Sequence, residues 1–462
     1  MVFSSFHFLF FFLPALLLCY FLIPQKLRAG RNLLLLAFSL FFYAYGGVRF
    51  LPLMLVSIGI NYLFGLLCAP GLRGRRLSLW LGTACNLALL GWFKYAGFAA
   101  RNLRLLGAEL AIPEVVLPIG ISFFTFQGMS YVFDVYRGEA APEKNPLWVA
   151  LYVSLFPQLV AGPIVRYTTV AGEIRTRQET LDGFTEGAVR FLFGLSKKLI
   201  LANGVGALAD AVYGSTLSGL TVSLAWLGSV AYTLQIYFDF SAYSDMAIGL
   251  GRIFGFHFLE NFDYPYISRS ITEFWRRWHI SLSTWFRDYV YIPLGGSRQG
   301  RGRTIRNLLA VWLLTGLWHG ASWNFILWGL LLFLLQLLER LGLGRILERR
   351  PVFGHLYMIL MIPLSFTVFA ITDLSQLGVY FGRLFPFCGS WAGIMAGDYL
   401  KYGRMYGVLL LLGLLFCLPW PKKLWRRLER SPLVIPFLLA IFWGAVYCLC
   451  RGMNDPFLYF GF

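Results

Sequence analysis

Two of the five histidines in this sequence lie in surroundings that suggest chemistry. His319 falls in the segment TGLWHGASWNFILW (315–328), inside an apolar stretch at 308–338. An ionisable side chain at membrane depth is costly, so it is by default a candidate functional residue. Polar groups crowd the same segment, on Trp318, Trp323 and Asn324. The alternative is that His319 is a neutral ring hydrogen-bonded to a neighbouring helix.

The stretch at 308–338 is too long for one ordinary membrane span. Its small residues predict either a helix break or the close approach of another backbone; they are Gly316, Gly320, Ala321 and Ser322. On a continuous helix, one face would carry Trp312, Gly316, His319 and Trp323.

His279 lies in the segment SRSITEFWRRWHISLSTWFRDYVYIPLGG (268–296). Ser270 and Glu273 form a capping-box pattern, which predicts that a helix begins there. Apolar residues then recur at helical spacing, while the opposite face carries charged residues. We expect one amphipathic helix that lies at the membrane interface without crossing it, with His279 on its apolar side. The alternative is that tryptophans anchor this helix and its histidine is incidental.

Two carboxylates, Asp239 and Asp245, lie in or beside an apolar run in the segment QIYFDFSAYSD (235–245). Acidic groups at this depth are candidates for supporting a nearby site, and we assign that role to Asp245. The alternative is a structural carboxylate paired with arginine or with a backbone donor.

Several familiar catalytic motifs are absent from the sequence, namely GxxxxGK[ST], GxSxG, HExxH and HxxxxD. The seven cysteines form no CxxC pair, and none has a histidine at metal-ligand spacing. We therefore expect no metal site. Serine-nucleophile, ATP-driven and zinc mechanisms have no support in this sequence.

The elements that carry these residues are predicted to be membrane helices. Hydrophobic residues make up 58% of the chain and charged residues only 13%, and the mean hydropathy is +0.66. Apolar runs of spanning length lie at 3–23, 32–48, 50–69, 77–93, 222–238, 355–371, 405–420 and 433–450. Less regular runs lie at 115–133, 147–165, 184–213 and 241–258; prolines and glycine predict that 147–165 is broken or re-entrant. We expect an all-α polytopic integral membrane protein with about 10 to 12 membrane segments.

The formal net charge of +18 arises from basic clusters in short loops between the apolar runs. This is the positive-inside pattern of a membrane protein and does not indicate nucleic-acid binding. The basic loops at 26–31 and 421–430 are expected to be cytoplasmic, with both chain ends outside. The first run lacks a basic n-region and a small-residue cleavage site, so we expect an uncleaved first helix. The chain is expected to form a single membrane domain, 1–462, with a motif-rich core at 117–330.

Six segments together resemble the membrane-bound O-acyltransferase family, in particular its bacterial alginate O-acetyltransferase branch. They are LPIGISFFTFQGMSYVFDVYRG (117–138), FPQLVAGPIVRY (156–167), YFDFSAYSDMAIGLGRIFGFHFLENFDYPY (237–266), EFWRRWHISLSTWFRDYVYIPLGGSR (273–298), GLWHGASWNFILWG (316–329) and DPFLYFGF (455–462). The resemblance covers roughly 117–330 and the tail, whereas the first hundred residues fit the family only by hydropathy. That branch also includes enzymes that acetylate peptidoglycan or exported cellulose.

The resemblance implies partly broken helices around a central catalytic conduit. It implies that His319 is the general base on an acceptor hydroxyl. His279 would orient the donor or stabilise the developing oxyanion. From the residues themselves, we expect Trp318, Asn324 and Asp245 to support the site.

The reaction that the resemblance implies is transfer of an acyl group, foremost acetyl, from a cytoplasmic thioester such as acetyl-CoA. No bound cofactor is expected, and basic side chains on the cytoplasmic side would hold the phosphates of the donor. The acceptor would be a hydroxyl of an extracytoplasmic polysaccharide or of a relay protein. We expect an exported esterase-like partner and a location in the bacterial cytoplasmic membrane.

Three alternative functions stay open at this point. D-alanyl transferases for teichoic acids share the same motif skeleton. A transporter or flippase also uses intramembrane histidines and broken helices, although inverted sequence halves are absent here. A scaffold that only recruits an exported acyltransferase would need no chemistry of its own.

Overall fold

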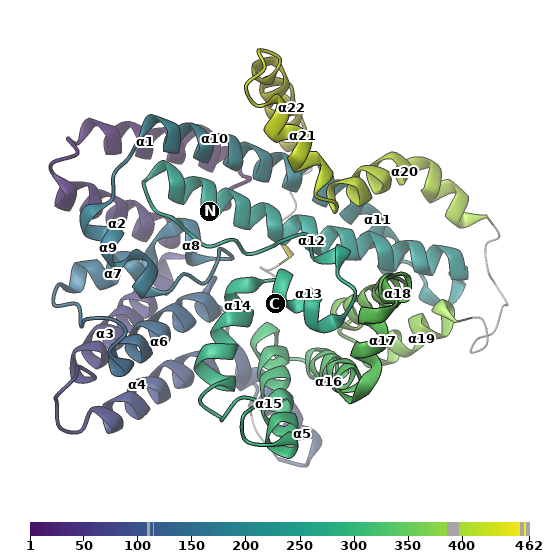
Figure 1. Ribbon diagram of the computed structural model, residues 1–462, viewed down its shortest axis with the longest axis horizontal. Helices are drawn as coiled ribbons and strands as arrows, with labels where there is room; N and C mark the ends of the chain where they lie inside the picture. The colour runs from purple at the N-terminus through teal and green to yellow at the C-terminus, as the bar shows by residue number, and fades with distance from the viewer. Residues whose placement is uncertain (109–110, 114, 386–396, 453–456, 459–462) are drawn as a thin grey trace. The chain divides into compact units, whose positions relative to one another are not determined.

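The computed structural model describes residues 1–108, 111–113, 115–385, 397–452 and 457–458 (Figure 1). All regular elements within these residues are helices, which confirms the predicted all-α class. The chain forms two compact units, each assembled from two segments of sequence. Unit 1 comprises Met1–Phe193 and Tyr243–Glu260, and unit 2 comprises Gly194–Ala242 and Asn261–Phe462. The single-domain assignment stays a prediction.

Five helical stretches are both long enough and apolar enough to cross a bilayer, counted over the described residues. They are Val48–Leu67, Leu181–Tyr213, Trp323–Arg349, Pro351–Ala370 and Asp398–Phe416. Two shorter apolar helices, Phe8–Leu22 and Val434–Cys450, add to them. These helices confirm a polytopic membrane protein, whereas the number of ten to twelve segments stays a prediction.

Six of the eight apolar runs of spanning length correspond to one helix each. These helices are α2 (Arg28–Tyr45), α3 (Leu51–Leu67), α4 (Arg75–Leu90), α18 (Pro351–Ala370), α20 (Asp398–Phe416) and α22 (Val434–Cys450). The first run contains the π-helical turn η1 (Phe8–Phe12) followed by α1 (Leu13–Leu22). The run at 147–165 is broken, as predicted, into α7 (Pro146–Ser154) and α8 (Phe156–Leu159).

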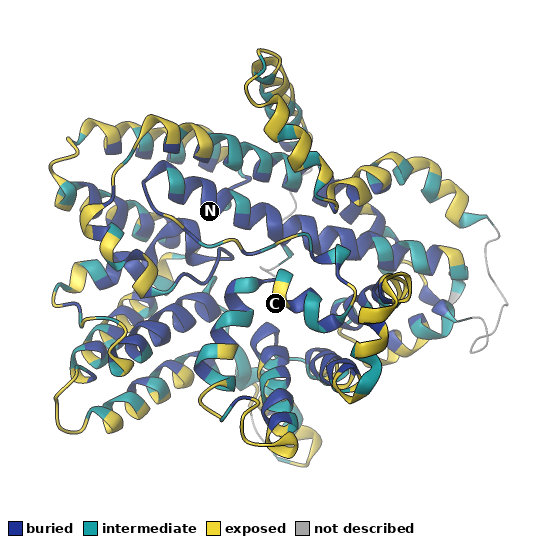
Figure 2. Cartoon of the chain, viewed as in Figure 1, coloured by how far each residue is buried: buried dark blue, intermediate teal, exposed yellow. Residues whose placement is uncertain are grey.

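One expectation about the helices is wrong. The runs at 222–238 and 241–258 were expected to be separate, but α12 (Val222–Ile253) is a single helix of 32 residues. It is buried along most of its length (Figure 2). Because its polar residues are enclosed by protein, Asp239 and Ser241 do not interrupt it. Along the chain α12 continues from unit 2 into unit 1.

Unit 1 is built around α6 (Ile121–Arg137), which is buried along nearly its whole length and packs against α3 and α4. A Cβ atom at Gly128 would lie 2.3 Å from the Asn61 side chain, so a glycine is needed for this close approach. Asn61 and Asn86 exchange amide hydrogen bonds between α3 and α4. Unit 1 also contains α5 (Ala96–Leu105), α9 (Tyr167–Thr176) and most of α10 (Leu181–Ser196).

A cluster of arginines around Glu179 ties the first basic loop to the segment after α9. Arg28 and Arg31 bind its carboxylate at 2.5 and 2.8 Å, and the buried Arg177 lies 3.5 Å away. Burial alone would raise the pKa of Glu179, but hydrogen bonds from Arg28, Tyr20 and Gln25 lower it to about 2. The carboxylate is therefore ionised at neutral pH and offsets the charge of the arginines.

Unit 2 has an aromatic core. The indole rings of Trp275, Trp312 and Trp328 pack edge to face, with centroids 5.0 to 6.2 Å apart. The remaining helices are α11 (Asn203–Tyr213), α13 (Ile271–Arg277), α14 (Ile280–Phe286), α15 (Arg301–His319), α16 (Trp323–Leu338), α17 (Gly344–Arg349), α19 (Leu374–Leu384) and α21 (Trp420–Leu428).

Candidate functional site

The predicted break in the long apolar stretch is confirmed. Helix α15 ends at His319, Gly320 is extended, and α16 begins at Trp323, so the two helices form a hairpin (Figure 1). The predicted close approach is also present. A Cβ atom at Gly316 would lie 2.3 Å from the Phe325 carbonyl oxygen, and one at Gly320 would meet the Phe325 ring. These glycines let the hairpin close and thereby fix where α15 ends.

His319 is buried at the carboxyl end of α15, in an aromatic setting. The rings of Trp318, Trp328 and Phe369 each lie with their centroids 5.1 Å from the imidazole centroid. The carboxyl end of a helix carries partial negative charge, which stabilises a positive imidazolium. The His319 ring is therefore carried at the negative end of this helix.

Asn324 contributes to the surroundings of His319 by binding the backbone of α18. Its amide nitrogen donates to the carbonyl oxygens of Phe369 and Val368, at 2.9 and 3.3 Å. The start of α16 is thereby tied to the end of α18, which positions the Phe369 ring against His319.

Trp323 was expected to share a helix face with His319, and this expectation is wrong. It is 52% exposed, because the break at Gly320 starts a new helix with a different phase.

His279 is in a different local structure from the one expected. The segment at 268–296 was expected to contain one continuous helix, but α13 and α14 are two short helices separated at Trp278 and His279. His279 has a φ of 44°, in the left-handed region that residues other than glycine seldom adopt. Among the described residues other than glycine, only Tyr264 shares this feature. Backbone strain of this kind often marks functional positions.

Asn261 holds the break in place. Its backbone carbonyl accepts a hydrogen bond from Ile280, and its side-chain oxygen accepts two from Ser281, at 3.1 and 2.9 Å. The Nδ1 atom of His279 lies 3.3 Å from the same side-chain oxygen. Burial lowers the pKa of His279 to about 3, so the ring is neutral at physiological pH.

Helix α13 begins with the predicted cap of Ser270 and Glu273, and Glu339 provides further hydrogen bonds there. The Ser270 hydroxyl accepts a hydrogen bond from the Glu273 backbone, and the Glu273 carboxylate accepts one from the Arg269 backbone. The Glu339 carboxylate further accepts from the backbone N–H groups of Ile271 and Thr272, at 2.6 and 3.0 Å. Because α13 has only seven residues, about 10 Å of helix, it is too short to cross a bilayer.

Unit 2 brings the two histidines to the same neighbours. The Trp318 ring lies 5.1 Å from the His319 centroid and 5.8 Å from that of His279. Phe240 packs edge-on against His279 at 4.6 Å. Phe240 also lines a cavity that His319 lines.

This cavity, of about 30 Å³, is enclosed mainly by apolar side chains. Its lining residues are Ile236, Asp239, Phe240, Trp278, His319, Trp328, Phe366, Phe369 and Leu458. A space of this size holds one or two water molecules. The cavity thus places one imidazole and one carboxylate in otherwise aromatic and aliphatic surroundings, while His279 lies behind Phe240.

The two carboxylates singled out from the sequence lie in different units. Asp239 lines the cavity and pairs with Lys198, with Nζ 2.5 Å from Oδ1. Asp245 lies in unit 1, where it pairs with Arg190 at 3.0 Å, and its role as a supporting residue stays a prediction. Asp239 was the residue that sequence reasoning did not assign to the site. Residues six apart on a helix point roughly 120° away from each other, so Asp239 and Asp245 face different surroundings although they are close in sequence.

Two further residues at the site were missed. Asn261 precedes α13 in an irregular segment, and Trp328 lies in an apolar run where its pattern is that of a core residue. No local signal distinguishes either from ordinary structural positions. Within the described part of the chain, no group of three or more His, Cys, Asp or Glu side chains is arranged to hold a metal ion.

Comparisons with known proteins place the chain among membrane acyltransferases. The family model for membrane-bound O-acyltransferases matches residues 79–381. A probable alginate O-acetylase of Pseudomonas putida is 40% identical over the full length of both chains. A peptidoglycan O-acetyltransferase of Helicobacter pylori is 38% identical over 72% of this chain and 69% of its own. A teichoic acid D-alanyltransferase of Bacillus subtilis is 32% identical over 46% of this chain and 56% of its own.

Proposed function

This chain belongs to the membrane-bound O-acyltransferase family, and from that premise we propose that it transfers an acetyl group from a cytoplasmic thioester to a hydroxyl of an extracytoplasmic polysaccharide. Membership makes it a membrane acyltransferase, so the transporter and scaffold alternatives are set aside.

The single observation that carries the proposal is the placement of His319. It is a buried imidazole at the carboxyl end of α15, on the wall of a small cavity, within a segment typical of the family. In the reaction, the acceptor oxygen forms a bond to the acyl carbon and the carbon–sulfur bond breaks. His319 takes the hydroxyl proton as general base and returns it to the leaving thiolate. The helix end stabilises the transient imidazolium.

His279 is proposed to orient the donor, one of the two roles expected for it. Its neutral ring has Nδ1 beside an oxygen that accepts hydrogen bonds from Ser281, so Nδ1 carries the proton and Nε2 is the acceptor. A ring in this tautomer accepts from an N–H or O–H group of a substrate at Nε2. Stabilisation of an oxyanion would require the opposite tautomer or a charged ring, which makes orientation the better-supported role.

The choice of acetyl and polysaccharide follows the relatives. Similarity extends over the full chain for the alginate O-acetylase and over less than half of it for the D-alanyltransferase. We propose acetyl-CoA as donor, held without any bound cofactor and with its phosphates against cytoplasmic arginine and lysine side chains. The enzyme would lie in the bacterial cytoplasmic membrane and act with an exported esterase-like partner. D-alanyl transfer to teichoic acid is the second candidate, favoured only by the partial similarity.

The test uses purified protein in lipid vesicles with a polysaccharide acceptor. Consumption of acetyl-CoA and of a D-alanyl carrier-protein thioester is compared for the wild type and for His319→Gln. The proposal expects turnover of acetyl-CoA that depends on the acceptor and falls by roughly 10²–10⁴-fold in the variant. Use of the carrier thioester alone would favour D-alanylation. Turnover that is normal in the variant would remove His319 from the chemistry.

A further inference from the structure

A buried ion pair stands beside the cavity. Lys198 lies in the π-helical turn η4 (Lys197–Ala202), Asp239 lies in α12, and their side chains are 2% and 4% exposed. Their atoms Nζ and Oδ1 are 2.5 Å apart. Removing two opposite charges from water costs free energy that their attraction only partly returns. Such a pair in a membrane protein is therefore a candidate functional feature.

Both members of the pair also hold residues near the end of the chain. The second carboxylate oxygen of Asp239 accepts a hydrogen bond from the Leu458 backbone at 2.8 Å. The Lys198 ammonium lies 4.5 Å from the centroid of the Phe457 ring, a cation–π distance, and Phe457 is 2% exposed. The pair therefore clasps two consecutive residues through two independent contacts.

One of the two clasped residues, Leu458, forms part of the wall around His319. Leu458 and Asp239 both line the cavity that His319 lines. Leu458 is separated from Asp239 by 219 positions in sequence, so this wall depends on tertiary contacts alone. Loss of the clasp would leave one side of the cavity without its aliphatic cover.

We propose that Lys198 and Asp239 are positioning residues that contact Phe457 and Leu458 and thereby hold Leu458 as a wall, which excludes water from the acyl group beside His319. The inference rests on the proposed function. A base that activates an acceptor hydroxyl can equally activate water. Water would then bond to the acyl carbon, the carbon–sulfur bond would break, and one water proton would pass to the thiolate. The products are free thiol and acetic acid, which releases its proton to solvent as acetate. The wall favours transfer by keeping that water out.

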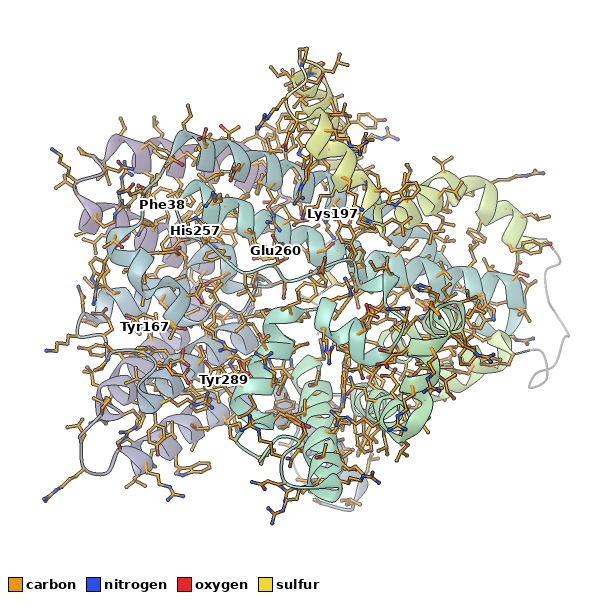
Figure 3. The ribbon with its side chains drawn as sticks, viewed as in Figure 1. Phe38, Tyr167, Lys197, His257, Glu260 and Tyr289 are labelled. Carbon is orange, nitrogen blue, oxygen red and sulfur yellow. The ribbon has the colours of Figure 1, made fainter. Side chains whose placement is uncertain are left out.

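Suitable variants distinguish loss of the cavity wall from general damage to the fold. Leu458→Ala removes the cover while leaving the ion pair, and Leu458→Met keeps a similar volume and serves as its conservative partner. Replacing only one charge would strand the other in the interior, so the pair is removed together in Lys198→Met/Asp239→Leu. Lys197→Met is the matched control, because Lys197 is the adjacent lysine (labelled in Figure 3) and its ammonium lies 3.3 Å from the Ser241 hydroxyl.

The measurement is the ratio of acetate released to acetyl transferred, per acetyl-CoA consumed, for purified protein in lipid. We expect the ratio to rise about tenfold in Leu458→Ala and in the double variant, and to stay at the wild-type value in Leu458→Met and Lys197→Met. An unchanged ratio in Leu458→Ala with measurable turnover overturns the inference. So does faster transfer in that variant, which would identify the wall as an obstruction. Absence of any thioester turnover by the wild type would instead refute the proposed function, and this inference with it.

Discussion

Gly316 offers a way to move His319 without touching it. A Cβ atom there would lie 2.3 Å from the Phe325 carbonyl oxygen, whereas ordinary contact begins near 3.4 Å. Because the obstructing atom belongs to the backbone of α16, no side-chain rotation relieves the clash. In Gly316→Ala the two helices must separate by about 1 Å, and the end of α15, one turn later, moves with them. A displacement of that size costs about 10²-fold in rate, or roughly 3 kcal/mol of transition-state stabilisation.

The assay is the rate of acetyl transfer per folded molecule, with folded protein quantified by its elution from a sizing column. Gly302→Ala is the matched control, since Gly302 lies in the same helix and has no atom within 4 Å of the added Cβ. The control should retain the wild-type rate. A normal rate in Gly316→Ala would refute the argument that the closeness of the hairpin positions His319.

Three further predictions concern Asn261, Glu179 and the two short helices α13 and α14. Asn261→Ala should lower kcat about tenfold by releasing His279, and an unchanged kcat would make the break at His279 irrelevant to turnover. Burial raises the pKa of Glu179, but hydrogen bonds from its arginine, tyrosine and glutamine partners outweigh this effect and lower the pKa to about 2, against an ordinary 4.5. Its stabilisation, about 3 kcal/mol, is therefore complete above pH 4.5 and is lost as the pH falls toward 2, so the Tm should fall over that range in the wild type and be lower but flatter in Glu179→Gln. Because α13 and α14 are too short to cross, cysteines at the exposed positions Arg269 and Ser297 should be labelled from the same side of the membrane; labelling from opposite sides would contradict the interfacial placement.

Much of the helical framework was predictable because apolar runs and small residues act locally. The ends of α3 and α22 fall within two residues of the predicted runs. The break after His319 followed from Gly320 and its small neighbours, which permit an extended backbone and a close hairpin. Periodicity and glycine placement carry this information in the sequence itself.

The local structure at His279 was not predictable from its own segment. Its apolar stripe continues in helical phase through the break, so periodicity favoured one helix. The break is held instead by Asn261, 18 positions upstream, whose oxygen replaces the helical hydrogen bonds. Likewise, the role of Asp239 depends on Lys198 and Leu458, which are distant in sequence. Contacts of this range leave no local pattern.

The central claim is that His319 performs the proton transfer and that His279 serves the same transition state. Acetyl-CoA consumption with acceptor present, measured per folded molecule for His319→Ala, His279→Ala and the double variant, tests it most directly. Residues that act as one catalytic unit show strongly non-additive losses. We predict a loss of roughly 10²–10⁴-fold for each single change and little more for both together. Near-normal turnover in His319→Ala would contradict the account, and additive losses of free energy would show that the two histidines act independently.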